Sequence, residues 1–276
     1  MLLRITFILI LASAIVGGTY FAIHSLYIEP EMKLKADKAA APPAPPGDPS
    51  LPDFRECLQI RQNSSPAAAV AAFERFLEAY PASTKRNEAR DALGELNSAM
   101  FFGVKATEQN SIVVKPGDSI ARISNRTKMP LELLVHLNKL KSDRIHPGQR
   151  LIAFPINFRL VLKQRDERVI LMRDDKFFRQ YPTLSWPGKK PLTPLPKQTV
   201  RVTDKSALND AGQPPKPLSD EFFGCFHTIG LPIAGHSVFS HPDETTRPLP
   251  NGIRLSREAM SEIAVLLPKG AQVTLE

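Results

Sequence analysis

The stretch SIVVKPGDSIARISNRTKMPLELLVHLNKLKSDRIHPGQRLIAFP, residues 111–155, decides the fold of the middle of the chain. The β-branched residues at its start predict a short strand over 112–115, and the Pro-Gly pair that follows predicts a turn. Asp118 then stands where the N-cap of a helix belongs, because its carboxylate can accept the first free backbone N–H groups. We therefore predict a first helix that runs to about residue 125.

The second half of this stretch predicts another helix and a closing strand. Pro130 suits the first turn of a helix, where its missing N–H is not needed. The apolar residues that follow recur at helical spacing and would form one face: Leu131, Leu134, Val135 and Leu137. Pro147-Gly148 predicts a turn into a strand over 150–154. The order is strand, helix, helix, strand.

These motifs resemble the LysM family, through VVKPGDSIxxI, then LxxxNxL and IxPGQxLxxxP, in the family's order and spacing. The resemblance implies binding to the N-acetylglucosamine-containing glycan strands of peptidoglycan. It places the groove between two loops, which here hold Gly117, Asp118, Ser119 and Ile120 and, further along, Arg144, Ile145, His146 and Pro147. Alternatively, Asp118 is only a cap and Ile145 only a core residue, with backbone groups of the loops binding the sugar. One small module is expected to bind weakly.

Residues 53–106, on the N-terminal side of this module, predict a helical hairpin. Ser65-Pro66 reads as an N-cap and first helical residue, and Pro81 ends that helix. A second helix is predicted over 85–102. The run 69–83 resembles a tetratricopeptide half-repeat, but no second copy follows at the required offset of about 34 residues, so we predict a connector rather than a repeat array.

The N-terminus predicts a membrane anchor over residues 1–30. Nineteen residues without a charge, 5–23, follow Arg4, and this is close to the length of a membrane-spanning helix. A cleaved signal peptide with its site near 12–14 is the alternative. The Ala/Pro-rich residues 31–52 predict an extended linker. These features together predict a single-pass protein of a bacterial inner membrane, with the bulk of the chain periplasmic or extracytoplasmic.

Residues 157–276 change to alternating strand patterns. An antiparallel meander is predicted over 158–163, 169–172 and 177–181. Further strands are predicted at three places along the rest of the region, 198–203, 222–226 and 272–275. Ser256 is predicted to cap one late helix over 257–267. The fold class is therefore multidomain α+β, with a mostly β domain at the C-terminal side.

This last region resembles the L,D-transpeptidase catalytic domain, through FRLVL, YPTLS, TP and GIRLSxEA. The family implies a histidine followed sixteen residues later by a nucleophilic cysteine in SHGCxR, which here correspond to His236 and Gly252. Pro250 also departs from that motif, and Arg254 matches it. Glycine cannot attack a carbonyl, so no catalytic residue is expected. The alternative is an active transpeptidase with a rearranged site, for which Cys225 would be the replacement nucleophile.

Composition narrows the remaining functions. The net charge of +8 favours an anionic neighbour, but no basic run interleaved with aromatic residues predicts nucleic-acid binding. Two distant cysteines and scattered histidines predict neither a disulfide framework nor a metal site, and no cofactor is expected. We predict a peptidoglycan-binding envelope protein whose last domain is inactive and still holds stem peptides or a partner. An envelope scaffold without wall binding is a further alternative.

Overall fold

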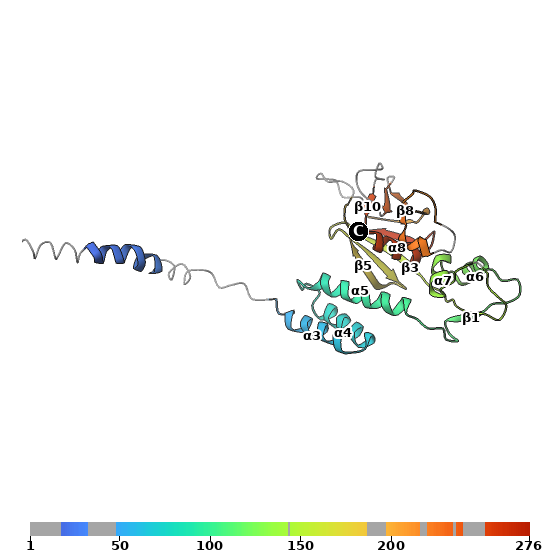
Figure 1. Cartoon of the computed structure of the whole chain (residues 1–276), viewed down its shortest axis with the longest axis horizontal. Helices are drawn as coiled ribbons and strands as arrows, with labels where there is room; N and C mark the ends of the chain where they lie inside the picture. Colours follow the sequence, from blue (N-terminus) through green and yellow to red (C-terminus); the bar gives the residue numbers. More distant parts are fainter. Residues whose placement is uncertain are drawn as a thin grey trace, which may run out of the picture. The chain divides into compact units, whose positions relative to one another are not determined.

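The computed structural model describes residues 18–32, 48–142, 144–186, 197–215, 220–233, 236–239 and 252–276. The chain divides into two compact units, Met1–Pro49 and Ser50–Glu276. The second unit contains the helices α3 to α8 and all the labelled strands (Figure 1). The two units are described separately.

The first unit corrects the predicted membrane topology. Its described part is helical over residues 18–32 and includes a π-helical turn, η1, at His24–Ile28. Within the described part of the chain, no helix has both the length and the apolar character to cross a membrane. The prediction of a single-pass inner-membrane protein is therefore wrong. Most of the predicted span over 5–23 lies outside the described residues.

The second unit begins with three helices, where the sequence predicted two. They are α3 (Leu51–Asn63), α4 (Pro66–Ala79) and α5 (Arg86–Phe102). The start of α4 is as predicted, because the Ser65 side chain accepts a hydrogen bond from the Ala68 N–H and Pro66 opens the helix. Residues 51 and 52 belong to α3 rather than to the predicted linker. In α3 only Phe54 and Cys57 are buried, so the apolar signal of that helix is weak.

The LysM stretch forms β1 (Ser111–Val113), α6 (Ile120–Thr127), α7 (Leu131–Leu137) and β2 (Arg150–Ile152). β1 and β2 pair antiparallel, so the predicted order of strand, helix, helix, strand is present. One detail differs: the N-cap of α6 is Ser119, whose hydroxyl accepts from the Arg122 N–H, and not Asp118. The apolar faces of the two helices turn inward, with Ile123, Leu133 and Leu134 fully buried.

A five-stranded sheet organises the C-terminal region. Its order is β5-β4-β3-β11-β6, and its strands are β3 (Phe158–Lys163), β4 (Arg168–Arg173), β5 (Lys176–Pro182), β6 (Gln198–Arg201) and β11 (Gln272–Leu275). The three strands β3, β4 and β5 form the predicted antiparallel meander. β11 runs parallel to β3 and antiparallel to β6, which places the last strand inside the sheet.

A second, four-stranded sheet has the order β10-β9-β8-β7. Its strands are β7 (Asp204–Leu208), β8 (Phe226–Ile233), β9 (His236–Phe239) and β10 (Gly252–Arg254). The predicted strand over 222–226 is wrong: a 3-10 helix, η2 (Asp220–Gly224), occupies most of it, and β8 begins at Phe226. α8 (Arg257–Leu266) has Ser256 as its N-cap, as predicted, since the hydroxyl accepts from the Ala259 N–H.

The LysM module and the C-terminal sheets share one hydrophobic core. A continuous cluster of buried side chains includes Ile123 and Leu134 of the LysM helices together with Leu160 of β3 and Ile263 of α8. Phe101, near the end of α5, joins this cluster and contacts the Phe154, Phe158 and Phe178 rings. The LysM module is therefore packed into the unit and is not held on a flexible tether.

Candidate functional site

The candidate site lies on two loops of the LysM module that backbone hydrogen bonds hold side by side. The Val114 N–H donates to the Gln149 carbonyl at 2.8 Å, and the Gly148 N–H donates to the Val114 carbonyl at 2.9 Å. Gly117 and Gly148 have φ values of 81° and 87°, which a residue with a side chain rarely adopts. The two glycines thus allow both loops to turn sharply next to the short β1–β2 ladder, and the loops form the two sides of one surface.

Asp118 stabilises the first loop from within. Its carboxylate accepts the Lys115 N–H at 2.9 Å and two hydrogen bonds from the Arg126 guanidinium, at 3.0 and 3.2 Å. These bonds lower the pKa of the Asp118 carboxyl below its usual value, and hydrogen bonding from Arg126 makes the largest contribution. Arg122, in the first turn of α6, also contacts this loop, because it donates to the Gly117 carbonyl at 2.6 Å. Neither arginine was predicted from the sequence to belong to the site. The two arginines are four residues apart, so they share one face of α6, next to the loop. This spacing is the feature of the sequence that could have indicated them.

The other two residues predicted on the first loop differ in exposure. Ser119 is exposed and caps α6, whereas the side chain of Ile120 is 4% exposed and belongs to the core. The backbone N–H groups of Gly117 and Ser119 have no hydrogen-bond partner among the described residues. A ligand at this loop would therefore meet free backbone donors and the Ser119 region, but not the Ile120 side chain.

The second loop combines exposed residues with one half-buried apolar residue. Arg144, His146 and Pro147 are exposed, and Ile145 is half-buried against the core. The His146 N–H donates to the Gln149 side chain at 3.1 Å, and the Arg144 N–H donates to the Ser142 hydroxyl at 3.4 Å. The structure thus brings the two predicted loops together, with Ile145 as the apolar residue between polar neighbours.

Asn138 fixes the framework behind the second loop, a role that the sequence analysis did not assign. Its side-chain amide donates to the Leu134 and Ile152 carbonyls at 2.8 Å each, and its oxygen accepts the Ile152 N–H at 2.7 Å. These bonds join α7 to β2, the strand that follows the loop. The asparagine of the LxxxNxL motif is therefore a positioning residue.

Of the positions that the sequence matches to the transpeptidase motif, His236 lies on β9, and Gly252 and Arg254 lie on the neighbouring strand β10. These strands are parallel, and Gly252 is in register with Ser237, the residue that follows His236. Gly252 has a φ of 154°, and residues other than glycine are rare in this region. The Arg254 N–H donates to the Ser185 carbonyl at 2.9 Å, which ties β10 to residues after β5. Pro250 lies outside the described residues.

Cys225 is placed as a packing residue. Its side chain is 0% exposed, and its thiol donates to the Glu221 carbonyl at 3.2 Å. Burial raises the pKa of the thiol, and Glu221 adds to this effect, so the thiolate needed for nucleophilic attack is disfavoured. Both cysteines of the chain are free and buried.

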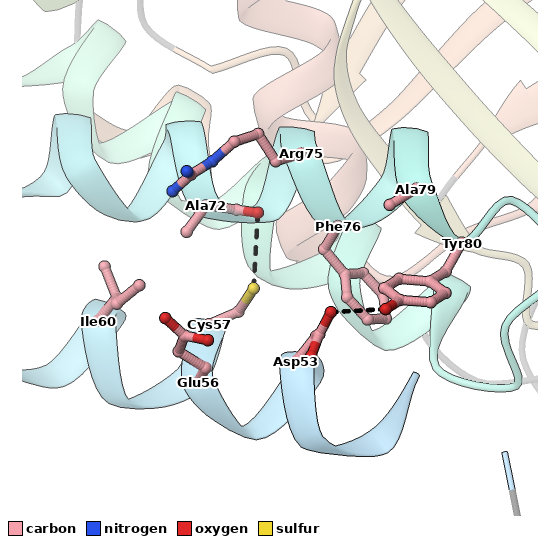
Figure 2. A pocket seen from close by; sticks show the side chains of 9 residues that line it. All are labelled: Asp53, Glu56, Cys57, Ile60, Ala72, Arg75, Phe76, Ala79 and Tyr80. Carbon is pink, nitrogen blue, oxygen red and sulfur yellow. Dashed lines mark hydrogen bonds between the residues drawn. The ribbon is translucent and has the colours of Figure 1, made fainter. Parts of the chain in front are cut away.

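Cys57 lines a pocket of about 210 Å³ between α3 and α4, remote in sequence from both predicted sites. Figure 2 shows its thiol directed at the Ala72 carbonyl, to which it donates at 3.5 Å, while the Tyr80 hydroxyl donates to Asp53 at 2.6 Å. Burial also raises the pKa of the Cys57 thiol. These contacts join α3 to α4. They account for the positions of Cys57, Asp53 and Tyr80 as bonding between the two helices.

A comparison with protein families agrees with the LysM resemblance. The model of the LysM domain family matches residues 112–153. The uncharacterized protein YkzQ of Bacillus subtilis is 47% identical over 36 residues, which are 13% of this chain and 48% of YkzQ. The chain therefore spans about half the length of this curated relative.

Among solved structures, the chain is similar to L,D-transpeptidases from three organisms. The Mycobacterium smegmatis enzyme has a TM-score of 0.31 at 15% identity, covering 47% of this chain and 63% of that one. The Xylanimonas cellulosilytica enzyme has 0.31 at 14%, covering 44% and 60%, and an Enterococcus faecium mutant has 0.30 at 15%, covering 49% and 56%. The chain spans about three fifths of the length of these proteins. It contains a LysM domain at residues 112–153, followed by a sheet-rich region similar to L,D-transpeptidase catalytic domains.

Proposed function

We propose that this protein binds the glycan strands of peptidoglycan in the groove between residues 117–120 and 144–147. LysM domains bind peptidoglycan, and the domain match supports a cell-wall-related function outside the cytoplasm. The observation that carries the proposal is the pairing of the two loops through Val114, Gln149 and Gly148. This pairing places free backbone N–H groups on one side and the half-buried Ile145 on the other.

The chemistry of these two sides suits an N-acetylated sugar. The N–H groups of Gly117 and Ser119 can donate to an acetamido carbonyl or a hydroxyl, because protein groups satisfy neither of them in the described part of the chain. Ile145 offers an apolar surface for the methyl group of the acetamide. The module is small, so one site binds weakly, and several contacts along a polymer strengthen the attachment.

A pull-down with insoluble peptidoglycan sacculi tests this proposal. Ile145→Asp should reduce binding about tenfold, because a charge at this position disfavours contact with the methyl group of the acetamide; this loss corresponds to about 1.4 kcal/mol. Ile112→Asp is the matched control, since Ile112 is also half-buried in the same module but lies on β1. Equal binding by both folded variants would remove Ile145 from the site. Absence of binding by the folded wild type would favour a scaffold without wall contact.

We also propose that the C-terminal region does not catalyse acyl transfer, and that it holds stem peptides or a protein partner. Two observations support this. Gly252 stands in register beside the residue after His236, where the family resemblance calls for the nucleophilic cysteine. Cys225, the remaining cysteine of this region, is fully buried with a raised pKa. Neither position supplies a thiolate.

Treatment with a carbapenem, followed by intact-protein mass spectrometry, tests the loss of catalysis. The wild-type protein should gain no mass, because the acyl-enzyme of this family forms on a cysteine thiolate and neither free thiol is exposed. The Cys225→Ala variant should behave identically. A covalent adduct on the wild type, lost in that variant, would show a rearranged active site. An adduct on both variants would place the nucleophile elsewhere.

A further inference from the structure

The LysM module carries most of the excess positive charge of the protein. Residues 111–155 contain eight lysines and arginines but three acidic residues. The whole chain has a net charge of +8, so this module contributes more than half of it. All eight basic side chains belong to exposed residues. Two of the acids are already paired, Asp118 with Arg126 and Glu132 with Lys205 at 3.9 Å, and the third, Asp143, lies outside the described residues. The surface of the module is therefore strongly cationic.

Three guanidinium groups belong to the two loops or to the helix that contacts them. Arg122 is anchored on the first loop by its bond to the Gly117 carbonyl, and Arg126 by its two bonds to Asp118. Arg144 is exposed on the second loop. Apart from the bond to Gly117, the guanidinium groups of Arg122 and Arg144 make no hydrogen bond or ion pair with any described residue. These two groups are available to a ligand in the groove.

Such groups are not needed for a neutral sugar. Arginine presents a planar fork of N–H donors that matches a carboxylate, and charge-assisted hydrogen bonds of this kind are stronger than those to hydroxyl groups. Peptidoglycan strands carry carboxylates on the peptide stems attached to alternate sugars. Neutral polymers of N-acetylglucosamine carry none.

We infer that the LysM groove selects glycan strands whose substituents bear carboxylates over neutral N-acetylglucosamine polymers, with Arg122 and Arg144 as the selecting residues. This inference rests on the proposed glycan binding and names its preferred substrate class. Wall polymers with phosphate groups share the same anionic chemistry. The stem carboxylates are the better match, because they are attached to the strand that occupies the groove.

Four ligands separate these possibilities for the full-length protein. They are sacculi, sacculi stripped of phosphate polymers with hydrofluoric acid, stripped sacculi whose carboxylates have been converted to methylamides with a carbodiimide, and chitin. Binding to the first two should be equal, and binding to the amidated sacculi and to chitin should be weaker by about three- to tenfold at low salt. Loss of binding after the acid treatment would identify phosphate as the anion and overturn the inference.

Variants assign the effect to the two arginines. The double variant R122Q/R144Q should lose about three- to tenfold in binding to stripped sacculi and lose less in binding to chitin, which carries no carboxylates. K128Q/K139Q is the control, because it removes the same charge from exposed residues that follow the C-terminal ends of α6 and α7. Equal losses in both double variants would mean a general charge effect and would overturn the role of the groove arginines.

The outcomes also separate this inference from the proposed function. Undiminished binding to amidated sacculi and chitin would reject carboxylate selection while leaving glycan binding intact. Failure to bind any of the four ligands, with circular dichroism showing a folded protein, would reject both.

Discussion

Replacement of Phe101 by alanine should lower the free energy of unfolding by about 3–5 kcal/mol, the range for a large aromatic side chain in a core. Phe101 is 5% exposed, and its ring lies edge-on to three others: Phe154 at 6.1 Å, Phe158 at 5.6 Å and Phe178 at 5.7 Å between centroids. The first of these lies at the end of the LysM module, after β2, and the other two belong to the five-stranded sheet. The variant therefore removes a contact that the helices, the LysM module and the sheet share.

Urea unfolding followed by two probes measures this effect. Circular dichroism and sacculus binding should lose their signals at the same urea concentration, because one continuous core predicts one transition. Met100→Ala is the control: Met100 precedes Phe101 on α5 but is 45% exposed, so its change should stay within about 0.5 kcal/mol. Separate transitions, with glycan binding unaffected by Phe101→Ala, would contradict a shared core.

The second large effect is a loss of stability in mild acid that depends on His227. This residue is 1% exposed on β8, and burial lowers the pKa of its imidazole from 6.5 to about 4, with a further lowering from the nearby charge of Lys205. Its folded pKa lies below its unfolded pKa, so the unfolded state binds the proton more readily. The contribution of neutral His227 to the free energy of unfolding should therefore be fully present above about pH 7.5. The free energy of unfolding should fall as the pH drops, by about 2 kcal/mol at about pH 5.

Comparison with His227→Gln isolates this contribution. The free energy of unfolding should fall less between about pH 7.5 and about pH 5 in the variant than in the wild type, because glutamine does not titrate. His146→Gln removes an exposed histidine and is the matched control. Identical pH dependence in all three proteins would mean that His227 is not held neutral in the folded state.

Elements with a complete local signal could be predicted from the sequence. The strands at Phe158–Lys163 and Gln272–Leu275 have the predicted bounds, and α8 begins directly after Ser256, because period-two patterns and a serine cap lie within each segment. The strand predicted over 222–226 failed because an apolar run alone does not separate a strand from a packed turn. β9 and β10 were not predicted, since their pairing joins segments that are distant in the sequence.

The candidate site, like the fold, could be predicted only in part from the sequence. The loops could be located from the Pro-Gly pairs at 116–117 and 147–148, because proline and glycine favour the backbone conformations of turns. The helix cap was displaced by one residue, to Ser119, since either side chain can fill that role and only the contacts of Asp118 with Lys115 and Arg126 decide between them. The packing of the LysM core against α8 and β3 depends on long-range contacts that no local pattern contains.

The position of β11 has a consequence for how this protein is made. β11 lies between β3 and β6, so the five-stranded sheet is interrupted until residues 272–275 have been synthesised. Before that point β3 and β6 each expose an unpaired edge, and nascent chains released early would offer those edges to one another. The five-stranded sheet can therefore close only after residues 272–275 have left the ribosome.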